Sequence, residues 1–418
     1  MQTNEQFLHA IVEDPDNDLP RLVYADWLDE QGDPRGEFIR VQCELAKLDE
    51  FDPDRIPLEE RQDTLLKKHK TKWSKDLKVA AIRVFEFRRG FVEAVTLNVK
   101  NHLQNAEALL DTVPTIRKVK VNALKAVVPE FITSKWLERI DSLNLAGNKL
   151  GLRRMRTLLE SPHFTEIREL DLTSNNILAG GFQAFVDSGK FPKLTKLICN
   201  NSEAAEPSKL SKIGCGPLWK QLESVELAEH AWEDDAIQTL AESWPVCGWK
   251  HLNLSFNAFA ERGFQALLEN GHLTSLESLS LKRCYRLPDS AIAMLANADA
   301  LGTLRSLDIR GCNYIEDGLN AVLNSQSLVE LRKLYISSAL FPEFYLPIVA
   351  HSTGLPNLET LYLSINPIQS SDLASLRQPN RLQQLKTLVI LAGTMDDDVL
   401  AELRELLPDV KIFIYSPY

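Results

Sequence analysis

Residues 252–257 read LNLSFN, and nine other stretches of the chain follow the same six-residue pattern. Each has hydrophobic residues at its first and third positions, and six of the ten end in Asn or Cys. The other stretches are LNLAGN (143–148), LDLTSN (170–175), LICNNS (197–202), VELAEH (225–230), LSLKRC (279–284), LDIRGC (307–312), LYISSA (334–339), LYLSIN (361–366) and LVILAG (388–393). Their first positions are 27 or 28 residues apart throughout. A fixed interval of this length indicates a repeat protein.

The rest of each repeat has apolar residues at helical spacing, for example Phe264 and Leu267, so each unit reads as strand, turn and helix. Two earlier stretches, VTLNVK from 95 and VKVNAL from 119, extend the series to about twelve repeats over 91–409. A helix is about 10 Å wide and paired strands lie about 4.8 Å apart. Stacked units must therefore curve, which predicts an α/β horseshoe solenoid with parallel strands on the concave side and helices on the convex side. Residues 410–418 are expected to form a capping strand.

The sixth position of the motif is predicted to hold the turns together. Asn148, Asn175, Asn257 and Asn366 stand there, and an amide at this place can bridge successive coils through their backbone groups. Cys284 and Cys312 are predicted to fill the space without bridging fully. The units from 225, 334 and 388 lack the Asn, and residues 200–217 are expected to form an irregular loop.

The period and the LxLxxN or LxLxxC motif resemble the leucine-rich repeats of the ribonuclease-inhibitor type. The resemblance covers roughly residues 91–415. It implies the same strand-lined horseshoe.

Residues 1–50 are predicted to form a small all-α domain of three helices. Asp18 is expected to cap the second helix, and Asp33 with Pro34 to begin the third. An apolar face of the second helix is expected to contain Val23, Tyr24, Trp27 and Leu28, and the third helix to bury Phe38, Val41, Leu45 and Leu48.

The many acids of this N-terminal stretch allow three interpretations. Asp14, Asp16 and Asp18 have calcium-loop spacing, but Leu19 and Ala25 occupy the positions of the required Gly and Glu. Asp26 and Glu30 could pair for acid–base catalysis, although residues 22–40 contain no His, Ser or Cys. The favoured interpretation is an acidic surface with helix caps and ion pairs within helices.

The stretch LVYADWLDEQGDPRGEFIRVQ (22–42) resembles the repeat-companion domain at the N-termini of many leucine-rich-repeat proteins of planctomycetes and related bacteria. The similarity continues through LLKKHKTKW (65–73) and RRGFVEAVTL (88–97). The resemblance implies a bacterial source and this architecture, and it implies no catalytic mechanism.

Residues 51–90 are predicted to be a basic helical connector, with ten Lys and Arg against three acids between 61 and 89. A nucleic-acid site with Trp73 as a stacking platform is one interpretation. The favoured one packs Leu65, Leu66 and Trp73 on the three-helix domain and places the lysines near its acids. Binding of nucleic acid is therefore not expected.

Composition and charge are those of an ordinary globular protein. The 418 residues are 44% hydrophobic and carry a net charge of −11, and residues 1–50 hold 13 acids against 4 bases. No apolar run is long enough to span a membrane, and no secretory segment begins the chain, so we expect a cytoplasmic protein. The six cysteines form no CxxC pair, and we expect neither a metal nor a cofactor.

Function is expected on the concave strand face. Its middle repeats are acidic at Asp171, Glu226 and Glu229. They are followed by a basic and aromatic group, and Tyr and Arg often dominate binding energy. The predicted partner-binding residues are Phe256, Lys282, Arg283, Arg310, Tyr335, Tyr362 and Ile365. Exposed tyrosines can also reflect strand propensity alone.

The sequence thus favours a non-enzymatic scaffold that binds a protein partner in its concavity, with no small-molecule substrate. An inhibitor or immunity-like regulator of a partner enzyme is the alternative, by analogy of fold. A hydrolase that uses the N-terminal carboxylates is the third possibility. The identity of the partner and the oligomeric state are not contained in these patterns.

Overall fold

The computed structural model describes residues 3–78, 82–201, 216–244, 248–271, 273–314, 316–337, 345–363, 368–377, 381–391 and 395–415. The chain divides into two compact units. The first comprises Met1–Asn175 and Lys190–Leu194, and the second comprises Asn176–Gly189 and Thr195–Tyr418.

Both units alternate strands with helices. The first unit contains α1 (Asn4–Glu13), α2 (Leu19–Glu30), α3 (Arg35–Lys47), α4 (Arg55–Trp73), η1 (Lys75–Lys78), β1 (Phe85–Arg88), β2 (Phe91–Asn98), α5 (Val99–His102), η2 (Leu103–Asn105), α6 (Ala106–Thr112), β3 (Lys118–Asn122), η3 (Leu124–Ala126), α7 (Val128–Phe131), η4 (Lys135–Arg139), β4 (Ser142–Asn144), α8 (Gly151–Leu158) and β5 (Glu169–Asp171). The second contains α9 (Leu178–Asp187), β6 (Lys196–Ile198), α11 (Leu218–Gln221), β7 (Ser224–Glu226), α12 (Asp234–Ser243), β8 (His251–Asn253), α13 (Glu261–Glu269), β9 (Ser278–Ser280), α14 (Asp289–Leu295), η5 (Asp299–Leu301), β10 (Ser306–Asp308), α15 (Glu316–Leu323), β11 (Lys333–Ile336), α16 (Tyr345–His351), β12 (Thr360–Leu363), η6 (Asp372–Arg377), η7 (Arg381–Gln384), β13 (Thr387–Leu391), α17 (Asp397–Leu406) and β14 (Lys411–Tyr415).

The strands pair in parallel, one repeat with the next, at the predicted motif positions. Leu143 lies opposite Leu170 in the first unit, and in the second unit Leu252 lies opposite Leu279. Because the same motif position meets itself across each pair, the leucines form buried stacks along the sheet. Among the strands of the described ranges, β1 differs in lying antiparallel to β2, at the start of the first unit.

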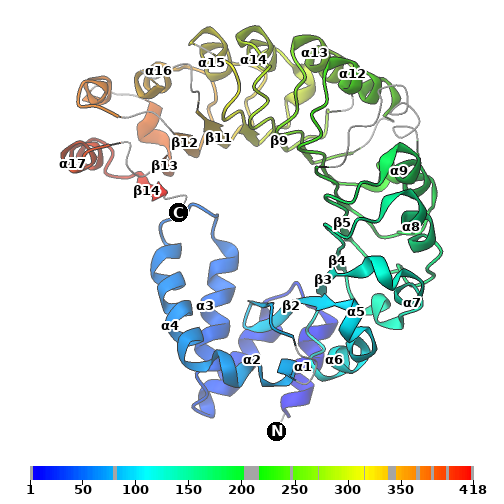
Figure 1. Cartoon of the computed structure of the whole chain (residues 1–418). Helices are drawn as coiled ribbons and strands as arrows, with labels where there is room; N and C mark the ends of the chain where they lie inside the picture. The colour runs from blue at the N-terminus through cyan, green and yellow to red at the C-terminus, as the bar shows by residue number, and fades with distance from the viewer. Residues whose placement is uncertain are drawn as a thin grey trace. The chain divides into compact units, whose positions relative to one another are not determined.

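Helices cover one side of these strands. Figure 1 shows α13, α14 and α15 of the second unit on the same side of β9 and β11. The apolar residues predicted for the helical half of each repeat are buried, including Ile237, Phe264 and Ile292. The predicted α/β class, a leucine-rich-repeat solenoid with parallel strands and helices on opposite sides, is confirmed.

Buried asparagines join successive turns as predicted. In the first unit Asn148 Nδ2 donates to the Val121 carbonyl at 2.7 Å and to its own repeat's Leu145 carbonyl at 2.9 Å. In the second unit Asn257 Nδ2 donates to Leu227 and Leu254 at 2.9 Å each. Each amide therefore satisfies one carbonyl of its own coil and one of the preceding coil. Asn366 lies outside the described residues.

Cysteine and histidine continue this ladder with a hydrogen bond to the preceding repeat, where the sequence predicted that cysteine bridges only incompletely. The thiols of Cys284 and Cys312 reach carbonyls of the preceding repeat, with Sγ at 3.3 Å from Leu254 O and 3.1 Å from Leu281 O. In the unit from 225, His230 stands at the sixth position, and its Nε2 lies 2.5 Å from Cys199 O. Since a thiol and an imidazole N–H can both donate, three residue types perform one structural task.

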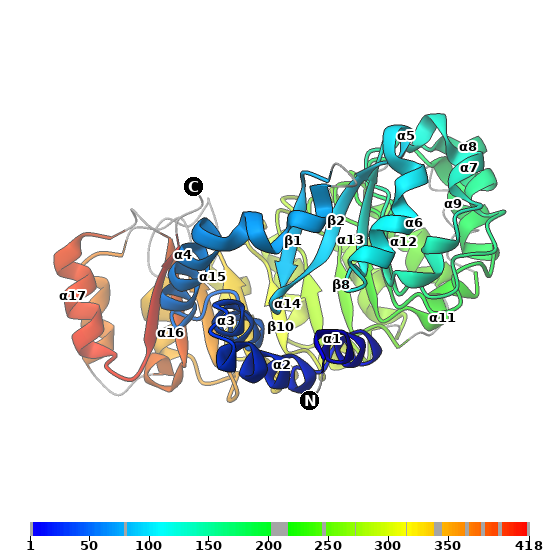
Figure 2. The same ribbon diagram turned by 90° about the horizontal axis from the view of Figure 1, so that it is seen from below.

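Helices α1 to α3 share a core with the first strands. Tyr24 and Phe91 stack with ring centroids 5.9 Å apart, and Ile11, Leu28 and Cys43 belong to the same buried cluster. Figure 2 shows β1 beside β2, with α1 and α2 near the turn that joins these strands. The N-terminal helices therefore cover the end of the hairpin.

Three predictions about these helices are wrong in detail. Val23 is 44% exposed, because the buried side of α2 is formed by Arg21, Tyr24, Ala25 and Leu28. Asp18 is the N-cap residue of α2 but its side chain makes no capping hydrogen bond, and Asn17 Oδ1 instead accepts the Leu19 N–H at 2.9 Å. Leu48 is only half-buried, whereas Phe38, Val41 and Leu45 are buried as predicted.

A buried ion pair links α2 to β2. Arg21, which is 1% exposed, donates from Nη2 to Glu93 Oε1 at 2.6 Å and to the Pro15 carbonyl at 2.8 Å. Burial raises the pKa of Glu93, although the charges of Arg21 and Arg117 act in the opposite direction. The pair fixes the position of α2 on the hairpin, because breaking it would leave a buried charge without compensation.

The basic helix α4 packs as favoured from sequence. Trp73 is buried and stacks on Phe38 of α3 at 4.8 Å. Arg61 binds Glu37 through two hydrogen bonds of 2.5 and 2.7 Å, and Lys72 binds Asp33 at 3.1 Å. The acidic and basic helices thus neutralise part of each other's charge.

Candidate protein-binding surface

The strand face, defined here as the side of the parallel strands opposite the helices, carries the middle residue of each L-x-L motif. Several of these residues turn back to their own backbone. Side-chain oxygens of Asn144, Asp171, Asn253 and Asp308 accept the N–H two residues later, at 2.9 to 3.1 Å. Their first role is to end the strand, as short Asx turns do.

Three predicted site residues, Arg310, Tyr335 and Tyr362, lie together on neighbouring strands. The Arg310 guanidinium is 5.0 Å from the Tyr335 ring centroid and 4.6 Å from that of Tyr362. It also binds Asp308 of its own strand, with Nε–Oδ1 at 2.9 Å and Nη2–Oδ2 at 2.5 Å. The positive charge is therefore already paired within the chain.

The expectation of an exposed tyrosine pair is wrong for Tyr362. This residue is 3% exposed, because Tyr335 lies on one side with ring centroids 5.8 Å apart and Tyr415 on the other at 6.2 Å. Tyr335 is half-buried. Aromatic contacts between adjacent strands bury the ring surface of Tyr362, so little of it is accessible to a partner.

The ionisation of the cluster reflects this packing. Burial acts to lower the pKa of Arg310, but the hydrogen bond and charge of Asp308 outweigh it and the pKa is raised. Burial also raises the pKa of Tyr362, against the opposing charge of Arg310. Both groups keep their ordinary protonation at neutral pH. The cluster is thus a stable cation–aromatic contact.

Two other predicted residues, Phe256 and Arg283, form an exposed pair. Phe256 is 37% exposed, and the Arg283 guanidinium lies 5.4 Å from the centroid of the Phe256 ring. Arg283 is exposed, and its guanidinium has no hydrogen bond or ion pair within the described residues. Unlike Arg310, it has donor groups available for a partner.

The backbone at this pair is unusual for such side chains. Both residues have φ of 57°, in the left-handed region, at the fifth position of the motif. We name the fifth positions the turn row, and φ lies between 47° and 74° at every one from the 119 repeat to the 307 repeat: Ala123, Gly147, Ser174, Asn201, Glu229, Phe256, Arg283 and Gly311. Glycine adopts this conformation without steric cost, whereas a bulky residue there is an outlier.

The remaining two predicted site residues are Lys282 and Ile365. Lys282 is half-buried, and its carbonyl accepts the Phe256 N–H at 2.8 Å, which joins the two turns. Ile365 lies outside the described residues. The structure therefore divides the predicted site into the enclosed Arg310 cluster and the exposed pair of the turn row.

Sequence reasoning missed the special place of the turn row. A signal was present, since Gly147 and Gly311 occupy it in two repeats and glycine commonly marks a left-handed position. The side chains of the other repeats at this position project from a strained backbone. Because the left-handed φ recurs through eight successive repeats, it is a feature of the turn, in which Phe256 and Arg283 are the bulkiest residues.

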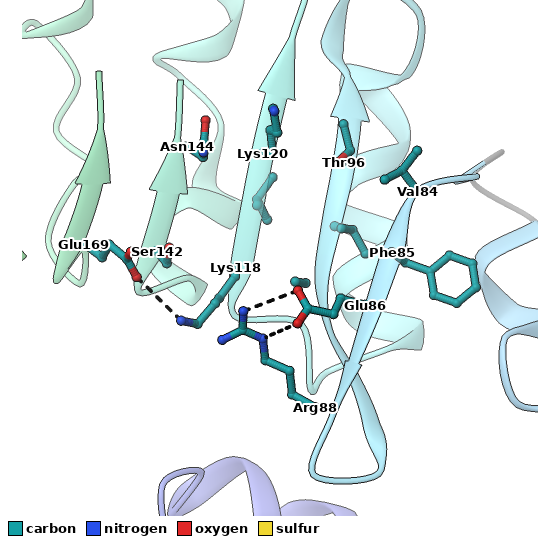
Figure 3. Close-up of a pocket in the computed structure, with 13 residues that line it drawn as sticks. Val84, Phe85, Glu86, Arg88, Thr96, Lys118, Lys120, Ser142, Asn144 and Glu169 are labelled. Atoms are coloured by element: carbon teal, nitrogen blue, oxygen red, sulfur yellow. Dashed lines mark hydrogen bonds and ion pairs between the residues drawn. The ribbon is translucent and has the colours of Figure 1, made fainter. Parts of the chain in front are cut away.

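A shallow pocket of about 300 Å³ lies on the strand face of the first unit, across β1 to β5. Figure 3 shows its two ion pairs, Glu86 with Arg88 at 3.1 Å and Lys118 with Glu169 at 3.5 Å. Lys120 points away from both pairs in this view. Both acids of the pocket, Glu86 and Glu169, are therefore already paired with bases of the same surface.

Acidic side chains of the N-terminal helices are held by arginines. Arg40 of α3 binds Asp26 and Asp29 of α2 at 2.5 Å each, and Asp16 binds Arg117 at 3.1 Å. These pairs join different parts of the chain, and the predicted kind of pair within one helix also occurs, between Lys47 and Glu44 of α3 at 2.8 Å. Over the described ranges, no group of three or more His, Cys, Asp or Glu could hold a metal ion.

A membrane-spanning helix is likewise not found in the part of the chain that the structure describes, because no helix there is both long and apolar enough.

The register of the strands, the buried asparagine ladder and the helix that follows each strand define a solenoid of the leucine-rich-repeat class. No protein-family model and no curated protein sequence matches the chain.

Several solved structures are similar to it. One is an internalin from Listeria monocytogenes, with 16% identity, coverage of 74% of this chain and 76% of that chain, and a TM-score of 0.39. A second is the complex of Rad7 and Elc1 in yeast, at 13% identity, with 86% and 97% covered and a TM-score of 0.36. A third is TLR13 in complex with single-stranded RNA, at 15% identity, with 73% and 47% covered and a TM-score of 0.39. Similarity at this level adds nothing to the class that the repeats themselves define.

Proposed function

We propose that this chain is a non-enzymatic scaffold that binds a protein partner on its strand face, the concave side of the horseshoe. The observation that carries the proposal is the exposed Phe256–Arg283 pair at left-handed backbone positions. A left-handed conformation costs an ordinary residue about 1–2 kcal/mol relative to the right-handed one. Retaining Phe where Gly would fit therefore favours a role for its ring in binding.

The chemistry of the surface supports a protein partner. An aromatic ring and an arginine are the side chains most often found at the centres of protein interfaces. The basic residues Arg61 and Lys72, which a nucleic acid would need, are instead bound to Glu37 and Asp33. The Asp26 carboxylate is held by Arg40, which supports a structural role for it in place of the hydrolase alternative.

The location and organisation are part of the same proposal. Cys43, Cys199, Cys284 and Cys312 are buried free thiols, as in proteins of a reducing compartment, which supports the cytoplasm. We propose a bacterial protein of the repeat-companion kind, with domain boundaries at 1–50, 51–90, 91–409 and 410–418. The packing of α1 to α3 on Phe91 supports a companion role for the first of these.

Site-specific photo-crosslinking in the native host would test the proposal. The photoreactive amino acid benzoylphenylalanine would replace Phe256 in one variant and Val329, which is 39% exposed between α15 and β11, in a matched control. We expect irradiation to join one defined protein to position 256 and none to position 329. The same adducts at both positions, or none at 256, would contradict binding at the strand face.

A further inference from the structure

We infer that the partner presents a carboxylate to Arg283 and a cationic group to Glu229, with an apolar side chain between them on the Phe256 ring. This inference rests on the proposed function and specifies the chemistry of the partner. It starts from three consecutive members of the turn row in the second unit. Glu229, Phe256 and Arg283 are exposed, and φ is 62°, 57° and 57°.

The order of these side chains is acid, ring, base. Neighbouring turns are joined by hydrogen bonds from Glu229 N to Ser255 O at 3.0 Å and from Phe256 N to Lys282 O at 2.8 Å. Adjacent parallel strands lie about 4.8 Å apart, so the backbone positions of Glu229 and Arg283 are about 10 Å apart, with Phe256 between them. Within the ranges of the chain that are described, neither charged side chain has an ion-pair partner.

Arg283 is prepared to bind a planar anion. Its stem lies against Gly311, where an added Cβ would come within 3.0 Å of Arg283 Cγ, and its guanidinium lies over Phe256. The ring holds the guanidinium by a cation–aromatic contact and leaves the N–H edges available. This fork matches the two oxygens of a carboxylate.

The acid at the other end of the row determines which anion fits. A nucleic-acid backbone would bring phosphates close to the Glu229 carboxylate, and like charges disfavour this. A protein segment can place a Lys or Arg there and an Asp or Glu at Arg283. Charge complementarity therefore favours a partner segment with basic, apolar and acidic residues in this spatial order.

The probe for this inference is a phage-displayed library of random peptides of about 12 residues, each of which spans up to ~40 Å when extended. Peptides would be selected on the full chain and their affinities measured against variants. We expect enrichment of peptides that combine a base, an apolar residue and an acid. Loss of the ring in Phe256→Gly should weaken them about 30-fold. Reversal of both charges, Glu229→Arg with Arg283→Glu, should weaken them at least tenfold.

A pair of glycine variants separates the position of Arg283 from backbone strain. Gly311→Ala adds a methyl group against the Arg283 stem and should weaken binding about tenfold. Gly147→Ala imposes the same left-handed strain at φ 74° but meets no atom within 4 Å, so it should leave affinity unchanged. Equal effects of the two variants would overturn the assigned role of Arg283.

Other outcomes also decide the matter. The inference would be overturned if no peptides were enriched or if the enriched peptides lacked acids. Equal affinity for the charge-reversed variant would also overturn it, as would tighter binding of single-stranded RNA than of peptides. If crosslinking at 256 captures a partner whose affinity is unchanged by charge reversal, the inference fails and the proposed function stands. If crosslinking captures none, both fail.

Discussion

His230 Nε2 lies 2.5 Å from the carbonyl oxygen of Cys199, in the place where Asn257 of the next repeat donates to Leu227. Because a carbonyl can only accept, this imidazole carries its proton on Nε2. The ring also stacks on Trp232, with centroids 4.2 Å apart. The repeat from 225 is therefore bonded to its predecessor through a different side chain.

The variants His230→Asn and His230→Ala should differ in stability. Asn can restore the donor, so we expect a change within about 1 kcal/mol, whereas Ala removes the hydrogen bond to the Cys199 carbonyl and should cost about 1–3 kcal/mol. Urea denaturation of the full chain measures both. Equal losses would show that packing on Trp232, and not the hydrogen bond, sets the contribution of His230.

Native cysteines of the ladder and the N-terminal core should resist alkylation. Burial is the main cause that raises the pKa of Cys43 and of Cys284 to about 12, so almost no thiolate is present at pH 8. Peptide mass spectrometry after iodoacetamide treatment should find both residues unmodified in the folded chain and modified in urea. Rapid labelling of Cys284 under native conditions would contradict its place in the ladder.

At position 256, glycine should give a more stable fold than alanine, the reverse of the order expected within a helix. Phe256→Ala keeps a Cβ in the left-handed region, whereas Phe256→Gly removes it, so we expect the Gly variant to be more stable by about 1 kcal/mol. Ala401→Gly, at an exposed site within α17, is the matched control and should lose about 1 kcal/mol. Denaturation midpoints of the three variants test the left-handed backbone directly.

Contact between α3 and α4 should weaken in acid. The hydrogen bond from Arg61 lowers the pKa of Glu37 from 4.5. Burial acts to raise the pKa of Asp33, but the Arg35 N–H and Lys72 outweigh it and lower the value from 3.8. A carboxylate with a lowered pKa stabilises the fold above its unfolded pKa, and this stabilisation is lost as pH falls through the folded pKa.

Fluorescence of the chain, to which Trp73 contributes, should therefore change as pH falls below about 4.5, and Glu37→Gln should remove part of the transition. An unchanged acid transition in this variant would mean that the Glu37–Arg61 pair contributes nothing to the contact.

Removal of one partner of the buried pair should be far more damaging than loss of a surface pair. Arg21→Ala leaves Glu93 buried without its cation, for which we expect a loss of about 3–5 kcal/mol. Arg40→Ala, which affects the partly exposed pairs with Asp26 and Asp29, should lose about 1 kcal/mol or less. Urea denaturation of both variants measures the contrast.

The strands, the ladder and the helical returns follow from the sequence alone. Leucines at 143 and 170, or at 252 and 279, recur at the interval of one repeat, and a recurring local pattern can bury its apolar face only by stacking on its copies. The same logic places Asn148 and Asn257 in the ladder. Gly147 and Gly311, at the fifth motif position of their repeats, mark the left-handed turn that the sequence prediction missed.

Only the tertiary structure decided which side chains remain available. Tyr362 and Phe256 both read as exposed aromatics, yet Tyr362 is enclosed by Arg310, Tyr335 and Tyr415 while Phe256 stays open. Arg21 and Glu93 meet across 72 residues of chain. The strand period repeats along the chain and can be read locally. Whether a charge or ring finds a partner depends on distances between coils, which no local pattern contains.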